Sequence, residues 1–198
     1  MIGLGAERLE RAGGVELTEE QSHELDERLS RREWAAFERA AEEGDFSNAL
    51  SRLSSSLVAK GIAYLDAEYG IPDDKLRDIL REHWTRCDAP GDTTEYLLAL
   101  FQRAGYVSDT DDRLTGELTI YRGTFGDDPS RGLSWTLDES KARWFASRGA
   151  RGVPRDRSTQ TVWRATVDAA DLLGYFTGRD EDEVVVDPAC LRELNQVA

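Results

Sequence analysis

The sequence has fewer basic than acidic residues, only two cysteines and no long hydrophobic run, and each shortage argues against a class of protein. The 198 residues include 25 Lys and Arg and 39 Asp and Glu, which gives a net charge of −14. A surface this acidic repels polyanions, so we expect no non-specific binding of nucleic acid. An anionic ligand would have to be held by a few specific arginines.

Cysteine and histidine are too few and too scattered for a metal centre. The cysteines are Cys87 and Cys190, with no CxxC pair and no Cys/His cluster. We therefore expect no structural zinc and no other metal. Two isolated thiols in a cytoplasmic protein are the preferred interpretation, and a single disulfide is the alternative.

Hydrophobic runs are too short for a membrane span, because no stretch of about 18 apolar residues occurs. Residues Met1 to Gly14 lack a basic segment followed by an apolar stretch, so we expect no signal peptide. These features predict a cytoplasmic protein, in the producing cell or in a host cell, that does not contact a membrane.

The first half of the chain has the apolar periodicity of helices. It predicts helices over about 18–44, 47–69, 72–88 and 93–104. Gly70 suits the C-terminal cap of the second helix, and Pro72 suits the first turn of the third.

Beyond about residue 112 the pattern changes to short β-branched and aromatic runs. The expected strands span 118–121, 132–136, 161–167, 172–176 and 184–186, and a helix that Asp138 caps runs to about Ser147. Trp144 and Phe145 on that helix are expected in the core. The sequence therefore predicts an α+β protein with a helical region over 1–112 and a mixed core over 113–198.

Three short segments of the second half carry candidate functional residues. Tyr121-Arg122-Gly123 closes a strand, Gly132-Leu133-Ser134-Trp135-Thr136 forms the next, and Glu181-Asp182-Glu183 precedes three valines, Asp187 and Pro188. Each has an ordinary alternative: a surface charge, a polar strand face, or acidic residues that keep a sheet edge soluble. Their joint occurrence in this order is hard to attribute to chance.

The order Arg, Ser-x-Thr, Glu-x-Glu resembles the R-S-E class of mono-ADP-ribosyltransferases, which includes bacterial toxins, phage enzymes and vertebrate ecto-enzymes. The resemblance covers about Leu118 to Pro188. It implies a core of two antiparallel sheets around a cleft for NAD, the co-substrate. The segment Ser134-Trp135-Thr136 departs from the usual Ser-Thr-Ser and keeps its first serine.

The resemblance also implies roles in binding NAD. Arg122 would bind the pyrophosphate, which a guanidinium grips with paired hydrogen bonds. Gly123 would let its backbone approach the nicotinamide amide. Ser134 would bond the ribose side, and Thr136, the other hydroxyl of that segment, is a further candidate for binding NAD.

The catalytic residues implied are Glu183 and Glu181. Cleavage of the nicotinamide–ribose bond builds positive charge on the ribose, and the carboxylate of Glu183 would stabilise it. Residues two apart on an extended strand share a face, so Glu181 would lie beside Glu183 and hold or deprotonate the acceptor. Family members with this first glutamate typically modify arginine, so the acceptor is expected to be an arginine of a target protein.

Secondary candidates surround these segments. Tyr175 or Phe176 would contact the target, with a packed strand as the alternative. Residues 149–157 match a loop over nicotinamide and phosphate, and its arginines are Arg151, Arg155 and Arg157, with a solvated loop preferred. His23 and His83 lie on expected helices and receive no function.

The leading hypothesis is a bacterial or phage toxin or effector that transfers ADP-ribose from NAD to a protein. Two alternatives stay open. One is an NAD glycohydrolase, in which water replaces the protein acceptor. The other is a non-catalytic binding module on a degenerate transferase fold, whose helical half would bind a neutralising or regulatory partner.

Overall fold

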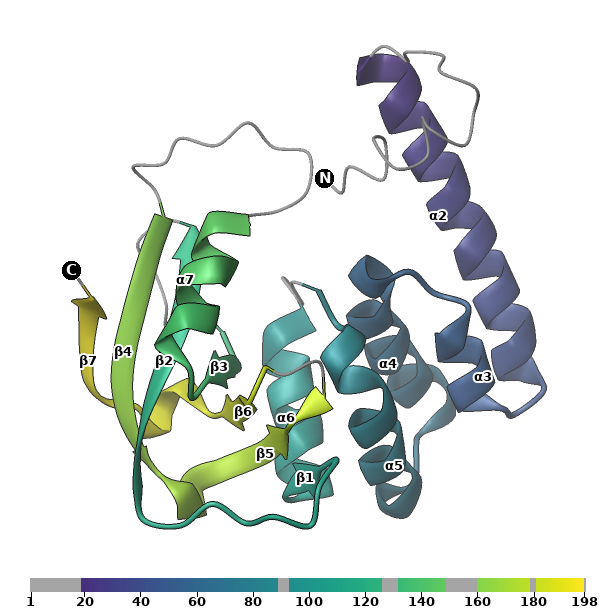
Figure 1. Ribbon diagram of the computed structural model, residues 1–198. Helices are drawn as coiled ribbons and strands as arrows, with labels where there is room; N and C mark the ends of the chain where they lie inside the picture. Colours follow the sequence, from purple (N-terminus) through teal and green to yellow (C-terminus); the bar gives the residue numbers. More distant parts are fainter. Residues whose placement is uncertain (1–18, 89–92, 126–131, 149–159, 179–180, 198) are drawn as a thin grey trace.

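The computed structural model describes residues 19–88, 93–125, 132–148, 160–178 and 181–197 (Figure 1). Helices fill the first half of the chain, and strands with one helix fill the second, so the predicted α+β class is confirmed. The α-helices of the described residues are α2 (Glu19–Glu42), α3 (Phe46–Ser51), α4 (Ser55–Tyr69), α5 (Asp73–His83), α6 (Thr94–Ala104) and α7 (Glu139–Arg148). Short 3-10 turns are η1 (Trp84–Arg86), η5 (Ala169–Asp171) and η7 (Pro188–Cys190).

The helix expected over 47–69 is interrupted, and the prediction of one continuous helix is wrong. It is divided into α3 and α4, because Ser54 is extended, with ψ of 157°. The break lets Leu50 and Leu53 fold back on Gly61 of α4, where an added Cβ would lie 2.5 Å from a Leu53 methyl and 3.0 Å from a Leu50 methyl. The chain thus leaves the helical conformation between α3 and α4, and close packing of the two helices at Gly61 is gained.

The predicted cap of α4 is confirmed at Gly70. This glycine has φ of 65° and its N–H bonds the carbonyl of Asp66, as a left-handed C-cap does. Pro72 follows as the N-cap of α5, one position earlier than the first-turn position expected for it. Asp73 and Asp74 open α5 and Arg81 closes it, so its end charges complement the helix dipole.

All five expected strands are present, and two more join them. The strands are β1 (Val107–Ser108), β2 (Glu117–Phe125), β3 (Ser134–Thr136), β4 (Gln160–Asp168), β5 (Leu172–Phe176), β6 (Glu183–Val186) and β7 (Arg192–Val197). β1 and β7 were not expected from the sequence. β1 lies before residue 113 and pairs in parallel with β5, so the sheet begins within the region expected to be helical.

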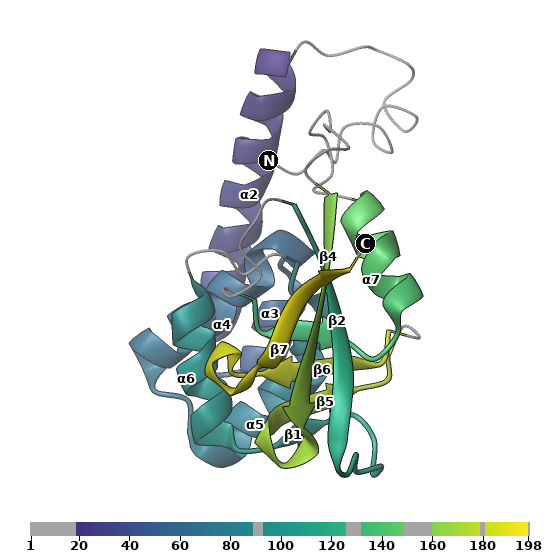
Figure 2. The same cartoon turned by 90° about the vertical axis from the view of Figure 1, so that its left-hand side faces the viewer.

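These strands form one seven-stranded sheet in the order β1-β5-β6-β3-β2-β4-β7, where two sheets are expected. Short β3 joins both halves because it pairs with β6 along its length and with β2 at the single pair Tyr121↔Thr136. The sheet turns sharply at this junction, and β5 and β6 run across the direction of β2 and β4 in both views (Figures 1 and 2). The result is one bent sheet with two differently oriented halves.

The core has three parts that follow this bend. Helices α2 to α6 bury a large cluster that also includes Phe176 and Val185 of the sheet and Leu133 just before β3. Trp135, Ile120 and other residues of both sheet halves form a second cluster. Ala142 and Ala146 of α7 pack on the opposite face of β2 and β4. The first of these clusters therefore joins the helical region to the β5-β6-β3 half.

The prediction that Trp144 lies in the core is wrong. Its side chain is 48 % exposed, while Phe145 is half-buried. Ala142 and Ala146 are one helical turn apart and face the sheet, so Trp144 between them points away from it.

Other expectations concern thiols and membranes. Cys87 and Cys190 are both free, as preferred from the sequence. Within the described residues, no helix is long and apolar enough to cross a bilayer. In the same residues, no three His, Cys, Asp or Glu side chains gather closely enough to hold a metal ion.

Candidate active site

Glu183 is the first residue of β6 and its carboxyl is buried in the sheet. Every residue of β6 is buried, and Glu183 itself is 8 % exposed. Val184 and Val186 pack into the cluster between the sheet halves, while Val185 packs against the helical cluster. Because side chains alternate along a strand, Glu183 shares the face of Val185 and looks toward the helices.

Two donors hold the same oxygen of Glu183. Ser134 Oγ donates to Oε1 at 2.5 Å, and the indole Nε1 of Trp84 donates to it at 2.7 Å. Ser134 comes from β3, which pairs with β6, whereas Trp84 comes from η1 at the end of α5. Among the described residues both hydrogen bonds of Glu183 go to Oε1, so Oε2 is left for a further partner.

Burial raises the pKa of Glu183 to about 7. The hydrogen bonds from Ser134 and Trp84 favour the charged carboxylate and act against this rise, as does the nearby Arg122. The charge of Glu181 acts in the same direction as burial. Glu183 therefore changes charge near neutral pH, as acid–base and electrostatic catalysts commonly do.

Arg122 connects β2 to the start of β3. Its Nη1 donates to the carbonyl of Ser134, and its guanidinium lies against Gly132, where a Cβ would collide with it. The side chain is half-buried overall, but its Nε is fully enclosed and has no hydrogen-bond partner among the described residues. Burial lowers the pKa of Arg122, and the charge of Glu183 opposes that shift.

Gly123 has a packing role that the sequence analysis does not foresee. It lies on the face of β2 under α7, where an added Cβ would run into the carbonyl of Ala142 and the N–H of Ala146. Both contacts are with helix backbone, so only glycine allows α7 to approach β2 this closely.

The hydroxyl of Thr136 is engaged within the chain. It donates to the carbonyl of Glu181 at 2.6 Å and accepts from the N–H of Asp138 at 3.1 Å. Thr136 is 4 % exposed. It therefore anchors the segment before Glu183 to the start of α7, and this structural use accounts for the hydroxyl at that position.

Glu181 lies near Glu183 for a different reason from the one expected. β6 begins at Glu183, and Asp182 has φ of 42°, so the two glutamates are not on one extended strand. Glu181 is half-buried and its charge nevertheless acts on the Glu183 carboxyl. The turn at Asp182, with the anchor at Thr136, brings them together.

Two secondary candidates are packed residues. Phe176 is fully buried against the helices, and Tyr175 is 8 % exposed with its hydroxyl donating to Asp182 at 3.1 Å. The alternative of a packed strand is thus the better description of β5. Residues 149–157, with Arg151, Arg155 and Arg157, lie outside the described residues.

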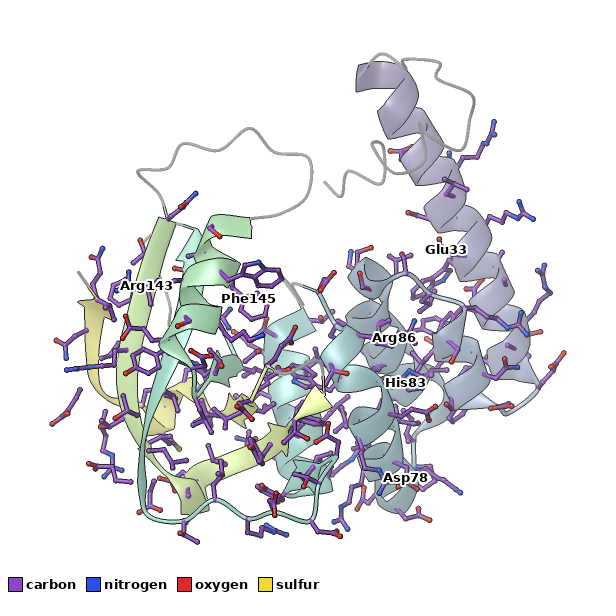
Figure 3. The ribbon with its side chains drawn as sticks, in the orientation of Figure 1. Glu33, Asp78, His83, Arg86, Arg143 and Phe145 are labelled. Atoms are coloured by element: carbon purple, nitrogen blue, oxygen red, sulfur yellow. The ribbon has the colours of Figure 1, made fainter. Side chains whose placement is uncertain are left out.

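The histidines keep no functional assignment. His23 falls within α2. His83 is buried at the end of α5, with Ser47 Oγ 3.0 Å from its Nε2 and Arg86 Nη1 3.2 Å from its Nδ1 (Figure 3). Burial lowers its pKa, so this histidine supports the helical packing in its neutral form.

Trp84 is a site residue that was not predicted from the sequence, where it falls within the helix expected over 72–88. Cys87, three residues after Trp84, also lies near Glu183. Burial is the largest cause that raises the pKa of its thiol to about 12, and the charge of Glu183 is the next. A buried indole needs an acceptor for its N–H, which is the one signal that points to a polar partner of Trp84. That signal does not identify Glu183.

Comparison with protein-family models, with curated proteins and with solved structures found no match.

Proposed function

We propose that this protein is a mono-ADP-ribosyltransferase that transfers ADP-ribose from NAD to a protein acceptor, an arginine, and releases nicotinamide. The observation that carries the proposal is the direct linkage of the three motif residues. Ser134 donates to Glu183 through its side chain and accepts from Arg122 through its carbonyl. In this proposal the two halves of the bent sheet correspond to the two sheets of the transferase core, and NAD binds where β3 joins them.

Glu183 would supply the charge that the reaction needs. As the bond from nicotinamide to ribose breaks, the electron pair leaves with nicotinamide and positive charge develops on the ribose. An ionised, fixed carboxylate beside that carbon stabilises the charge, and a buried site makes the effect larger than in water. With Oε1 held by Ser134 and Trp84, Oε2 is available to bond the ribose 2′-hydroxyl.

Arg122 would bind the pyrophosphate of NAD. Its guanidinium already uses Nη1 on the carbonyl of Ser134, while its Nε is an enclosed donor without a partner among the described residues. A buried donor of this kind is unusual in a native protein and asks for an acceptor. A phosphate oxygen supplies one after a small rotation of the side chain.

Glu181 would act on the acceptor. It lies just before the turn at Asp182 and is half-buried, so its carboxylate is more accessible than that of Glu183. An arginine side chain pairs well with such a carboxylate, and the pair would hold the guanidinium near the ribose carbon.

The test is incubation of the purified protein with NAD and a bacterial lysate, followed by measurement of released nicotinamide and of ADP-ribose on protein. Glu183→Gln keeps an acceptor oxygen for Ser134 and Trp84 but removes the charge, so it should abolish both signals. Glu43→Gln, an exposed glutamate after α2, is the matched control and should retain them.

Other outcomes of the same assay separate the alternatives. Nicotinamide without labelled protein, lost in Glu183→Gln, would assign a glycohydrolase. No turnover and no change of melting temperature with NAD would reject the NAD-dependent function and favour a binding module on a degenerate fold.

A further inference from the structure

The helical half of the chain reaches Glu183 through one side chain. Trp84 lies 99 positions before Glu183 and follows α5 directly. It is 3 % exposed, and its ring stands edge-on to Phe101 of α6, with centroids 4.8 Å apart and planes at 87°. Packing of η1 against α6 thus fixes the indole, and its N–H donates to Oε1.

We propose that Trp84 is a positioning residue of the active site, which holds Oε1 of Glu183 so that Oε2 is directed to the ribose of NAD. This inference rests on the proposed function, because only a reacting NAD gives the orientation of Oε2 a catalytic consequence. It assigns the helical half a part in catalysis, which the resemblance over 118–188 does not include.

A second donor is needed because Ser134 alone leaves the carboxyl group loosely oriented. The last torsion of a glutamate side chain is broad, and a serine hydroxyl rotates to follow its acceptor. An indole N–H lies in the plane of a rigid ring and does not follow. With donors at 2.5 Å and 2.7 Å on one oxygen, rotation of the carboxyl group would break at least one bond.

Packing alone does not account for a tryptophan at this position. A buried indole N–H can be satisfied by a backbone carbonyl at little cost, as Trp135 does by donating to the carbonyl of Gly132 at 3.2 Å. The indole N–H of Trp84 instead donates to the buried carboxyl of Glu183, whose ionised form costs free energy to bury. Buried carboxyl groups with specific donors of this kind cluster at functional sites.

The experiment compares Trp84→Phe with Trp34→Phe. Trp84→Phe keeps an aromatic ring and loses the N–H that bonds Glu183. Trp34→Phe loses the same group elsewhere in the helical half, where the N–H bonds Glu38 and not Glu183, so it is the matched control. Glutamate labelled with carbon-13 at the side-chain carboxyl gives the titration of Glu183 by NMR, with Glu183→Gln identifying its signal. Nicotinamide release gives kcat and KM for NAD.

Trp84→Phe should raise the titration midpoint of Glu183 by about one pH unit, because it removes a hydrogen bond to the charged form. It should also lower kcat about tenfold with KM for NAD within about twofold, the signature of an interaction made in the transition state. Trp34→Phe should leave the midpoint of Glu183 and kcat close to those of the parent, because its indole bonds Glu38. If Trp84→Phe unfolds, benzothienylalanine at position 84, which keeps the bicyclic ring without the N–H, makes the same comparison.

Equal midpoints in Trp84→Phe and Trp34→Phe would overturn the inference, as would a raised KM with unchanged kcat. Failure of the proposed function gives a different result. A parent protein with no turnover of NAD rejects the transferase, and the NMR titration still decides whether Trp84 holds Glu183.

Discussion

The guanidinium of Arg122 packs so closely on Gly132 that a Cβ at position 132 would occupy the space of its Cζ, Nη2 and Nε. The same guanidinium donates to the carbonyl of Ser134, two positions further on. Because Gly132 has no side chain, the guanidinium of Arg122 can lie against the start of β3. The first motif segment and the second are coupled through this contact.

Gly132→Ala should impair binding of NAD more than folding. The new methyl meets the far end of a flexible side chain, so Arg122 can move aside at a cost in stability of about 1 kcal/mol, close to the value of its one hydrogen bond. The displaced guanidinium would no longer meet the pyrophosphate. We expect KM for NAD to rise about tenfold or more, measured by nicotinamide release, with a small change in urea denaturation. A normal KM would show that Arg122 does not bind NAD from this position.

Gly123→Ala should lower the stability of the fold more than it impairs binding of NAD. Its methyl meets the backbone of α7 at Ala142 and Ala146, which cannot rotate away, so the helix must shift from β2. Overpacking of this kind costs about 3 kcal/mol. Urea denaturation of the two alanine variants side by side measures the contrast. Equal stabilities would contradict the packing role assigned to Gly123.

Local sequence signals are sufficient for most elements. The β-branched and aromatic run that includes Tyr121 predicts β2, and the valines after Glu183 predict β6, because such residues fit a pleated, buried surface. Gly70 ends α4 for the conformational reason expected. The pairing of β3 with β6 then brings Ser134 and Glu183, from two of the three motif segments, into contact.

What the sequence does not predict depends on contacts between distant segments. In the sequence, Trp84 continues the apolar pattern of the helix expected over 72–88, and nothing near it marks Glu183 as its acceptor. β7, with Arg192 and Glu193 at its start, is largely exposed and lacks the apolar alternation of a buried strand, so only its pairing with β4 defines it. The left-handed turn at Asp182 likewise breaks the strand alternation that the Glu-x-Glu pattern suggests.

Glu183→Gln should stabilise the protein at alkaline pH. The pKa of Glu183 is about 7 in the folded chain and 4.5 for an ordinary glutamate, so between these values the folded state binds the extra proton. Stability from this group is full below about pH 4.5 and is lost as pH rises to about 7. The loss amounts to about 3 kcal/mol, which glutamine avoids because it carries no charge.

Urea denaturation of the parent and of Glu183→Gln at pH 5 and at pH 8 checks this expectation. The free-energy difference between the two proteins should be small at pH 5 and should favour glutamine at pH 8. The control Glu43→Gln removes an exposed carboxyl group outside the site and gives the baseline for loss of one charge. A difference between parent and Glu183→Gln that does not grow with pH would mean that Glu183 is not held in a costly buried state.

Turnover of NAD should rise with pH through about 7, because only the ionised form of Glu183 stabilises positive charge on the ribose. Well below that midpoint, kcat/KM should increase about tenfold for each pH unit.

Ser134→Ala removes a hydrogen bond that lowers the pKa of Glu183, so its midpoint should lie higher and its plateau lower than those of the parent. Thr136→Ser keeps the hydroxyl that anchors Glu181 and should reproduce the parent midpoint, which makes it the control on the same strand. Nicotinamide release between about pH 5 and 9 measures all three curves. A profile that is flat, or that falls with rising pH, would assign the reacting charge to a group other than Glu183.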